Sequence, residues 1–188
     1  MIVLVLATPR SGSSWFTGTY LSDIYPNYTD AGEPFNSHIY SREQQTAALR
    51  GMINGEHSIV KLFPQHLHNA AANTYNTLVT VAEKIYVLVR KDFNAQLRSL
   101  YVAEQSDYYY RADLPTRSIQ YNADIYKHTS EFLQTSYKIL AQQWRRLSDV
   151  ELVYLEDLPQ SGKYRQPVLW DQEPPKIDFD TAALFTTV

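Results

Sequence analysis

The chain has 188 residues, of which 44% are hydrophobic, enough for one α/β domain with a substantial core and too few for two. Its 17 basic residues are outnumbered by 20 acidic ones, so no overall positive charge exists to attract nucleic acid or an anionic membrane. The absence of cysteine excludes disulfides, thiolate metal sites and cysteine nucleophiles, and it fits a reducing, cytoplasmic location. No apolar stretch approaches the ~18 residues that span a bilayer. We therefore expect a single domain over residues 1–188, in which any anion site is local.

The hydrophobic pattern predicts alternating strands and helices. The first run, Ile-Val-Leu-Val-Leu-Ala, is aliphatic throughout, as is typical of a strand covered on both faces of a parallel sheet. A capping box at Ser41–Gln44 and a cap at Asp92 mark two helix starts. In chain order the predicted elements are a strand at 2–7, a helix at 13–22, a weak strand within 28–35, a helix at 41–53, a strand at 58–63, a helical stretch after Pro64, a strand at 84–89, helices at 92–104 and 123–147, and a strand at 150–155.

This alternation predicts an α/β domain with a P-loop-like parallel sheet of about four to five strands flanked by helices. Ligands then bind at the carboxyl edge of the strands. Residues 105–122 are polar and aromatic without a sustained period, and we expect a lid or acceptor loop there. Residues 159–188 are rich in proline, and we expect an irregular C-terminal segment.

The loop Thr8-Pro-Arg-Ser-Gly-Ser-Ser-Trp15 follows the first strand directly and opens a helix. A loop of small residues at a helix start directs several backbone N–H groups to one point and forms an anion cradle. The loop lacks the second glycine and the lysine of the nucleoside-triphosphatase pattern, which weakens the case for ATP hydrolysis. An ordinary strand-to-helix turn with a serine cap is the alternative interpretation.

The same eight residues resemble the 5'-phosphosulfate loop of the sulfotransferases that use 3'-phosphoadenosine 5'-phosphosulfate (PAPS), whose usual form is T-x-P-[KR]-S-G-[TS]-[TS]-W. The resemblance implies that the loop amides and hydroxyls hold the phosphosulfate. It also implies that Arg10 stabilises charge as the sulfuryl group moves. Trp15 completes the motif, although its side chain is expected in the core. The implied cofactor-binding residues of this loop are Arg10, Ser11, Gly12, Ser13, Ser14 and Trp15.

A second motif, Arg90-Lys-Asp followed by Gln96-Leu-Arg-Ser99, is similar to the 3'-phosphate site of the same family. It is closest to the bacterial carbohydrate, or trehalose-type, branch, and it implies that Arg90 and Ser99 bind the 3'-phosphate. In a helix starting near Asp92, Gln96 and Ser99 share one face, so Ser99 is able to point toward the strand end. A strand-end surface charge and a neutral helix residue are the alternatives.

Two later segments extend the resemblance more weakly. Tyr154-Leu-Glu-Asp-Leu158 resembles a late family strand ending in Y-E-D-L, and its residues are expected to be structural. Ser161-Gly-Lys-Tyr-Arg165 is the only counterpart of the family's late glycine-rich loop. The tyrosines at 108–110, with Arg111 and Tyr121, line the acceptor pocket in one interpretation and pack the loop onto the sheet in the other.

Candidate groups for the chemistry lie near the second and third strands. Glu33, which is followed by proline, resembles the catalytic glutamate of the bacterial branch. The alternative interpretation of Glu33 is a solvated loop carboxylate. Asp30 is the second candidate for the base. Lys61 lies within an otherwise apolar strand, where an unpaired charge is costly, so we expect it to face the site and contact the transferred group. Phe63 stands where the cytosolic branch has a histidine. Four of the five histidines, His38, His57, His66 and His68, are weaker base candidates, expected to be surface or helix residues.

We therefore expect a sulfotransferase that moves a sulfuryl group from PAPS to an acceptor hydroxyl, with a carbohydrate as a candidate acceptor. No metal cofactor and no nucleic-acid partner are implied. Two alternatives stay open. One is a nucleotide or small-molecule kinase of the same fold, and the other is a non-catalytic nucleotide-binding relative.

Overall fold

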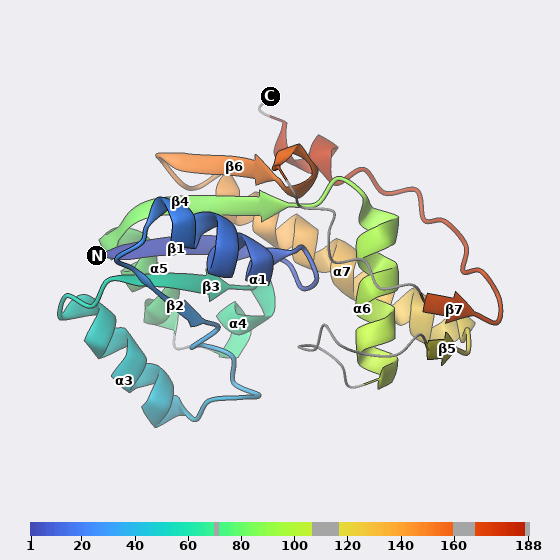
Figure 1. Cartoon of the computed structure of the whole chain (residues 1–188), viewed down its shortest axis with the longest axis horizontal. Helices are drawn as coiled ribbons and strands as arrows, with labels where there is room; N and C mark the ends of the chain where they lie inside the picture. The colour runs from blue at the N-terminus through green and yellow to red at the C-terminus, as the bar shows by residue number, and fades with distance from the viewer. Residues whose placement is uncertain (70–71, 107–116, 160–167, 187–188) are drawn as a thin grey trace.

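The computed structural model describes residues 1–69, 72–106, 117–159 and 168–186. Its centre is a five-stranded sheet in which every neighbouring pair is parallel, and Figure 1 shows the strands running the same way. The predicted α/β class and parallel sheet are thus confirmed. The strand order is β2-β3-β1-β4-β6, with bounds β1 (Ile2–Ala7), β2 (Thr29–Gly32), β3 (Ser58–Leu62), β4 (Ala82–Val89) and β6 (Val150–Tyr154).

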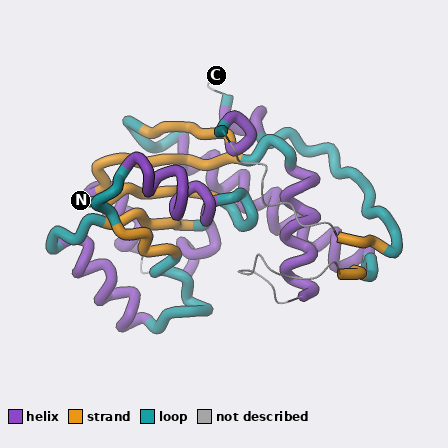
Figure 2. The backbone as a smooth tube through the Cα atoms, viewed as in Figure 1, coloured by secondary structure: helices purple, strands orange, loops and turns teal. Residues whose placement is uncertain are grey.

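Helices connect these strands (Figure 2). The segment after β1 is helical from Ser13 to Ile24 and includes a π-helical stretch, η1 (Phe16–Leu21), between α1 (Ser13–Trp15) and α2 (Ser22–Ile24). The capping box at the start of α3 is present, since Ser41 Oγ accepts from the Gln44 amide and the Gln44 side chain accepts from the Ser41 amide. The other helices are α3 (Arg42–Ile53), α4 (Pro64–Asn69), α5 (Ala72–Val81), α6 (Phe93–Ser106) and α7 (Ala123–Trp144).

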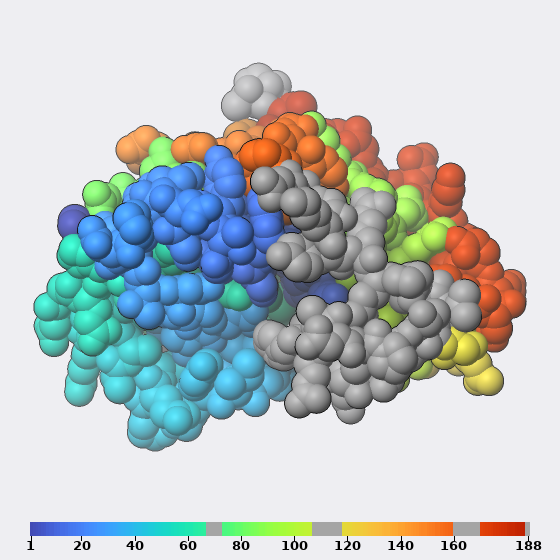
Figure 3. Space-filling model, in the orientation of Figure 1, coloured from blue at the N-terminus to red at the C-terminus, as the bar shows by residue number. Residues whose placement is uncertain are grey.

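Both faces of the sheet are covered, as the uninterrupted apolar run of β1 predicts. Successive side chains of a strand point to opposite faces, so Val3 and Val5 pack with Phe16 on one side. Ile2 and Leu4 join the larger core formed with α5, α6 and α7 on the other side. Figure 1 shows α1 in front of the sheet and α7 behind it, and in the space-filling view the N-terminal segment covers the front of the sheet (Figure 3).

The C-terminal segment and the 105–122 segment are more regular than expected. Arg117–Ile119 forms a short strand, β5, that pairs in parallel with β7 (Val168–Trp170). A 3-10 helix, η3 (Ala182–Phe185), follows and buries Phe185. The loop expected at 105–122 thus contains a short strand, and the irregular segment expected at 159–188 contains a strand and a 3-10 helix. Three-residue strands that pair across a long separation leave no local period in the sequence. Residues 107–116 and 160–167 lie outside the described residues.

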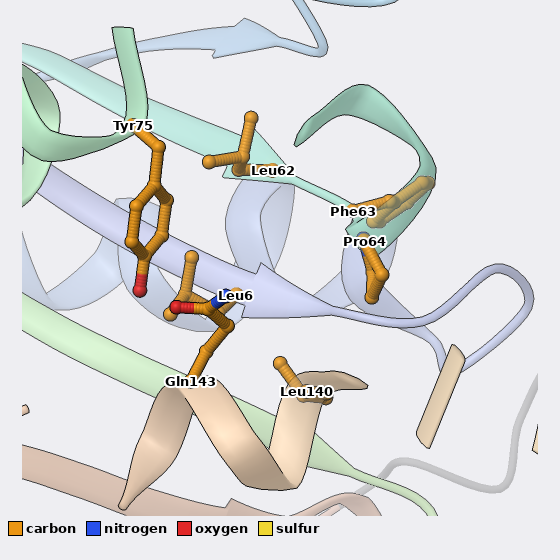
Figure 4. Close-up of a pocket in the computed structure, with 7 residues that line it drawn as sticks. All are labelled: Leu6, Leu62, Phe63, Pro64, Tyr75, Leu140 and Gln143. Atoms are coloured by element: carbon orange, nitrogen blue, oxygen red, sulfur yellow. The ribbon is translucent and has the colours of Figure 1, made fainter. Parts of the chain in front are cut away.

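An apolar pocket lies beyond the carboxyl ends of β1 and β3, on the side covered by α5 and α7 (Figure 4). It has no charged lining residue among those described, so it offers an anion no counter-charge. We interpret it as a packing gap. The lining residues are Leu6, Leu62, Phe63, Pro64, Tyr75, Leu140 and Gln143. Within the described part of the chain, no helix is long and apolar enough to cross a membrane.

The strand order creates a switch point between β1 and β4. After β1 the chain continues toward β2 on one side of the sheet, and after β4 it continues toward β6 on the other side. Parallel sheets of this kind bind ligands outside the carboxyl ends of the strands at such a point. The loops that follow β1 and β4 are therefore the first place to look for a site.

Candidate functional site

The loop after β1 has an unusual backbone conformation. Gly12 has φ 87°, and Arg10 has φ 59°, although it is not a glycine. Left-handed backbone costs a residue with a side chain about 1–2 kcal/mol, and residues held in it concentrate at functional sites. Gly12 is also required by packing, because a Cβ there would lie 2.8 Å from Cδ2 of Leu155 in η2 (Leu155–Asp157). The loop is therefore held in one strained shape against the end of β6.

The two motifs meet at the switch point. Arg10 Nε donates to Ser99 Oγ at 3.0 Å, across 89 residues of sequence. Arg90 Nη1 donates to the Arg10 carbonyl at 3.3 Å, and Arg90 Nε lies 3.7 Å from a Glu156 carboxylate oxygen. Two guanidinium groups and a hydroxyl are therefore grouped beside the loop, next to one carboxylate. Arginine binds phosphate through a planar fork of donors, so this grouping suits a multiply charged anion.

Gln96 and Tyr137 hold the loop to the two long helices, and sequence reasoning did not assign either a role. Gln96 is fully buried and donates to Thr8 Oγ1 at 2.8 Å and to the Pro9 carbonyl at 2.6 Å. The Tyr137 hydroxyl donates to Gln96 Oε1 and accepts from the Arg90 amide. Burial raises the pKa of Tyr137 to about 12, so this hydroxyl remains a donor at neutral pH. The shared helix face of Gln96 and Ser99 is a sequence signal for Gln96, whereas nothing local indicates Tyr137.

Lys61 connects β3 to the loop. Its side chain is almost fully buried, and Nζ donates to Ser14 Oγ at 3.1 Å. The same Nζ lies 3.8 Å from Glu33 Oε1. The orientation expected from a charge inside an apolar strand is therefore present, because the lysine reaches the helix start and a carboxylate.

Glu33 is not a solvated loop carboxylate. Its side chain is only 10% exposed, and Oε2 accepts from Asn36 Nδ2 at 3.1 Å. The rival Asp30 is occupied elsewhere, since its carboxylate accepts from the Thr17 hydroxyl and the Gly32 amide, each at 2.9 Å. Of the two, Glu33 is the carboxylate that lies beside Lys61.

His66 lies in the helix α4, which agrees with the expectation of a surface or helix residue, and its side chain is buried beside Glu33. Its Nδ1 accepts from the Phe63 amide at 3.2 Å, and its Nε2 lies 3.9 Å from Glu33 Oε2. Burial, assisted by the charge of His38, lowers the pKa of His66 to about 4, so the ring is neutral at physiological pH. His38 and His57 are exposed as expected, and the side chain of His68 lies outside the described residues.

The late strand has the structural role expected of it. Glu156 accepts from the amides of Lys91 at 2.9 Å and Asp92 at 3.2 Å, and Asp157 bonds the Lys91 ammonium at 2.6 Å. These contacts attach the end of β6 to the loop after β4. Asp92 in turn caps α6 by accepting from the Ala95 amide at 2.9 Å.

The remaining candidates either pack within the fold or lie outside the described residues. Trp15 is half-buried against Tyr20, and Tyr121 packs edge-on against Tyr126, which favours the packing interpretation for both. Ser13 is buried. The tyrosines at 108–110, Arg111 and the segment 161–165 belong to the part of the chain that is not described.

The chain matches no protein-family model, and a search of curated proteins found no match. No cluster of three or more His, Asp or Glu residues in the described part of the chain is arranged to hold a metal ion. The side chains of the site combine two guanidinium groups, an ammonium group and several hydroxyls with the Glu33 carboxylate.

Proposed function

We propose that the protein is a PAPS-dependent sulfotransferase with a P-loop-like sheet, which transfers a sulfuryl group to an acceptor hydroxyl, with a carbohydrate as the candidate acceptor class. The observation that carries this proposal is the contact between the two motifs. Arg10 bonds Ser99 and accepts from Arg90, at the switch point of the sheet. Neither motif is specific by itself, but the contact supports the proposal because the residues that resemble the two phosphate sites lie within hydrogen-bond distance of each other at one edge of the sheet.

The residues present fit such a nucleotide. The buried hydroxyl of Ser11 has no hydrogen-bond partner among the described residues, and it lies in the loop that would hold the phosphosulfate. The helical segment that starts at Ser13 continues to Ile24, so its first N–H groups and its dipole favour an anion at the loop. Arg90 and Ser99 would hold the 3'-phosphate. In the bound state, charge-assisted bonds to phosphate would replace the Arg10–Ser99 bond.

The nucleotide would supply the sulfuryl group. The acceptor oxygen would form a bond to sulfur as the bond between sulfur and the bridging oxygen of the 5'-phosphate breaks, and Glu33 would take the acceptor proton. Lys61, which bonds Ser14 of the loop, and Arg10 would stabilise the charge of the leaving oxygen. Catalysis by positioned charges and one general base accounts for large rate effects without covalent chemistry by the protein.

Calorimetric titration tests the nucleotide assignment. We expect 3'-phosphoadenosine 5'-phosphate to bind without magnesium and more tightly than ATP. Loss of charge-assisted bonds in Arg90→Ala should weaken it by about tenfold or more. Arg50→Ala, the same substitution at an exposed position of α3, is the matched control and should bind as the wild type does. Preferential binding of ATP with magnesium would favour the kinase alternative, and binding of neither nucleotide would contradict the proposal.

Radiolabelled sulfuryl transfer from PAPS to trehalose or glucose tests the reaction. Glu33→Gln should keep its affinity for the nucleotide and lose about 100-fold or more in transfer rate, as expected for removal of a general base. Intact nucleotide affinity without transfer to any hydroxyl acceptor would instead identify a non-catalytic relative.

A further inference from the structure

We propose that His66 is a positioning residue for Glu33: it holds the carboxylate with Oε2 turned toward the imidazole, leaving Oε1, on the Lys61 side, as the oxygen that accepts the proton. This inference rests on the proposed function, in which Glu33 is the general base.

The contacts of Glu33 separate its two oxygens. Oε2 accepts from Asn36 at 3.1 Å and faces His66 Nε2 at 3.9 Å. Oε1 faces Lys61 Nζ at 3.8 Å, and that ammonium also bonds Ser14 in the anion loop. Lys61 therefore connects the anion loop to Oε1, while Oε2 accepts from Asn36 and faces His66.

The surroundings of His66 determine which nitrogen carries its proton. The Phe63 amide donates to Nδ1 at 3.2 Å, so a neutral ring carries its hydrogen on Nε2. The ring also stacks on Phe63 with centroids 5.1 Å apart, which limits its rotation. Nε2 is buried and has no hydrogen-bond partner in the described part of the chain, and it lies 3.9 Å from Glu33 Oε2. A buried donor without a partner costs free energy, so a contact that satisfies it is favoured.

His66 orients the base and does not replace it. Its Nε2 already carries a hydrogen and Nδ1 is occupied by the backbone, so the ring has no free site for the acceptor proton. The distance of 3.9 Å between His66 Nε2 and Glu33 Oε2 is longer than a hydrogen bond. A shift of about 1 Å of either side chain would bring the two atoms within hydrogen-bond distance. Catalytic hydrogen bonds are often long before substrate binds. Among the described residues, Lys61 from β3 lies beside Glu33, and His38 from the loop before α3 acts electrostatically on His66.

Nuclear magnetic resonance of full-length protein with ¹⁵N-labelled histidine tests the contact without a substrate. The His66 signals are assigned by their absence in His66→Asn. We expect one neutral tautomer, protonated on Nε2, whose Nε2–H resonance moves in Glu33→Gln. It should not move in Glu131→Gln, an exposed position on α7. A mixture of tautomers, or an Nε2–H resonance that Glu33→Gln leaves unchanged, would overturn the inference.

Two substitutions at His66 separate positioning from mere support of the fold. The amide nitrogen of His66→Gln reaches the place of Nε2 and keeps a donor toward Glu33, whereas His66→Asn keeps an acceptor near Nδ1 and loses that donor. In transfer from PAPS to trehalose, we expect His66→Asn to lower kcat about tenfold or more. The acidic limb of its pH–rate profile should move to higher pH, because a donor that favours the carboxylate is lost. His66→Gln should recover most of kcat, and both should keep the wild-type Kd for 3'-phosphoadenosine 5'-phosphate.

Equal kcat and pH profiles in His66→Asn and wild type would refute positioning, as would loss of nucleotide binding in both variants. Failure of the wild type itself to bind the nucleotide would contradict the proposed function instead. In that case the resonance comparison still decides whether His66 and Glu33 interact.

Discussion

Replacing Gly12 with alanine tests how the anion loop is held. The residue has φ 87°, and its new Cβ would lie 2.8 Å and 2.9 Å from the two methyl carbons of Leu155. The left-handed backbone costs a residue with a Cβ about 1 kcal/mol. Leu155 is buried and has little room to move, so overpacking adds about 1–3 kcal/mol. We expect Gly12→Ala to lower the free energy of unfolding by about 2–4 kcal/mol.

Urea unfolding followed by circular dichroism measures this loss. With a slope near 2 kcal/mol per molar urea, the midpoint should fall by about 1–2 M. Gly32→Ala is the matched control, since Gly32 has φ 63° and a methyl added there would have nothing within 4 Å, so only the backbone cost of about 1 kcal/mol applies. In a Leu155→Ala background, the cost of Gly12→Ala should fall to the same value. Equal costs of Gly12→Ala in both backgrounds would refute the packing argument.

Three further substitutions address the buried polar groups. Gln96→Leu removes the donor to Thr8 Oγ1 and the Pro9 carbonyl and the acceptor of the Tyr137 hydroxyl, and we expect it to lower the free energy of unfolding by about 2–4 kcal/mol in urea titrations. Lys61→Met isolates the buried Glu33 carboxylate and should cost about 2–4 kcal/mol, part of which an added Glu33→Gln recovers. Burial lowers the pKa of His66 from 6.5 to about 4, so acidification from pH 6.5 to 4 protonates it only in the unfolded chain. The wild type should therefore lose up to about 3 kcal/mol of stability over this range that His66→Asn does not lose, as measured by urea unfolding at each pH.

Each of these expectations has a result that contradicts it. A Gln96→Leu variant as stable as the wild type would mean that the loop acceptors find other donors. Additive losses for the Lys61 and Glu33 substitutions would show that the two side chains do not interact. Parallel pH dependence in wild type and His66→Asn would mean that His66 titrates alike in the folded and unfolded chains.

Local patterns were sufficient where neighbouring residues decide the structure. The aliphatic side chains of residues 2–7 are enough to predict a strand buried on both faces. The capping box is formed by Ser41 and Gln44, which are only three residues apart. The alternation of such elements predicted the parallel sheet, and its carboxyl edge predicted where the loop at 8–15 would lie. The orientation of Lys61 also followed from the sequence, because a charge within an apolar strand must reach a polar group.

Tertiary structure decided the contacts that join distant segments. The pairing of β5 with β7 depends on a register between short strands far apart in the chain, and such strands carry too few residues to show a period. The bonds of Gln96 to the loop and to Tyr137 depend on how α6 and α7 cross the end of the sheet. The burial of His66 beside Glu33 depends on how α4 lies against the loop after β2. Sequence patterns report which side of an element is apolar. Which polar groups meet there is determined only when the packed elements bring them within a few ångströms, where burial makes an unpaired donor or charge costly.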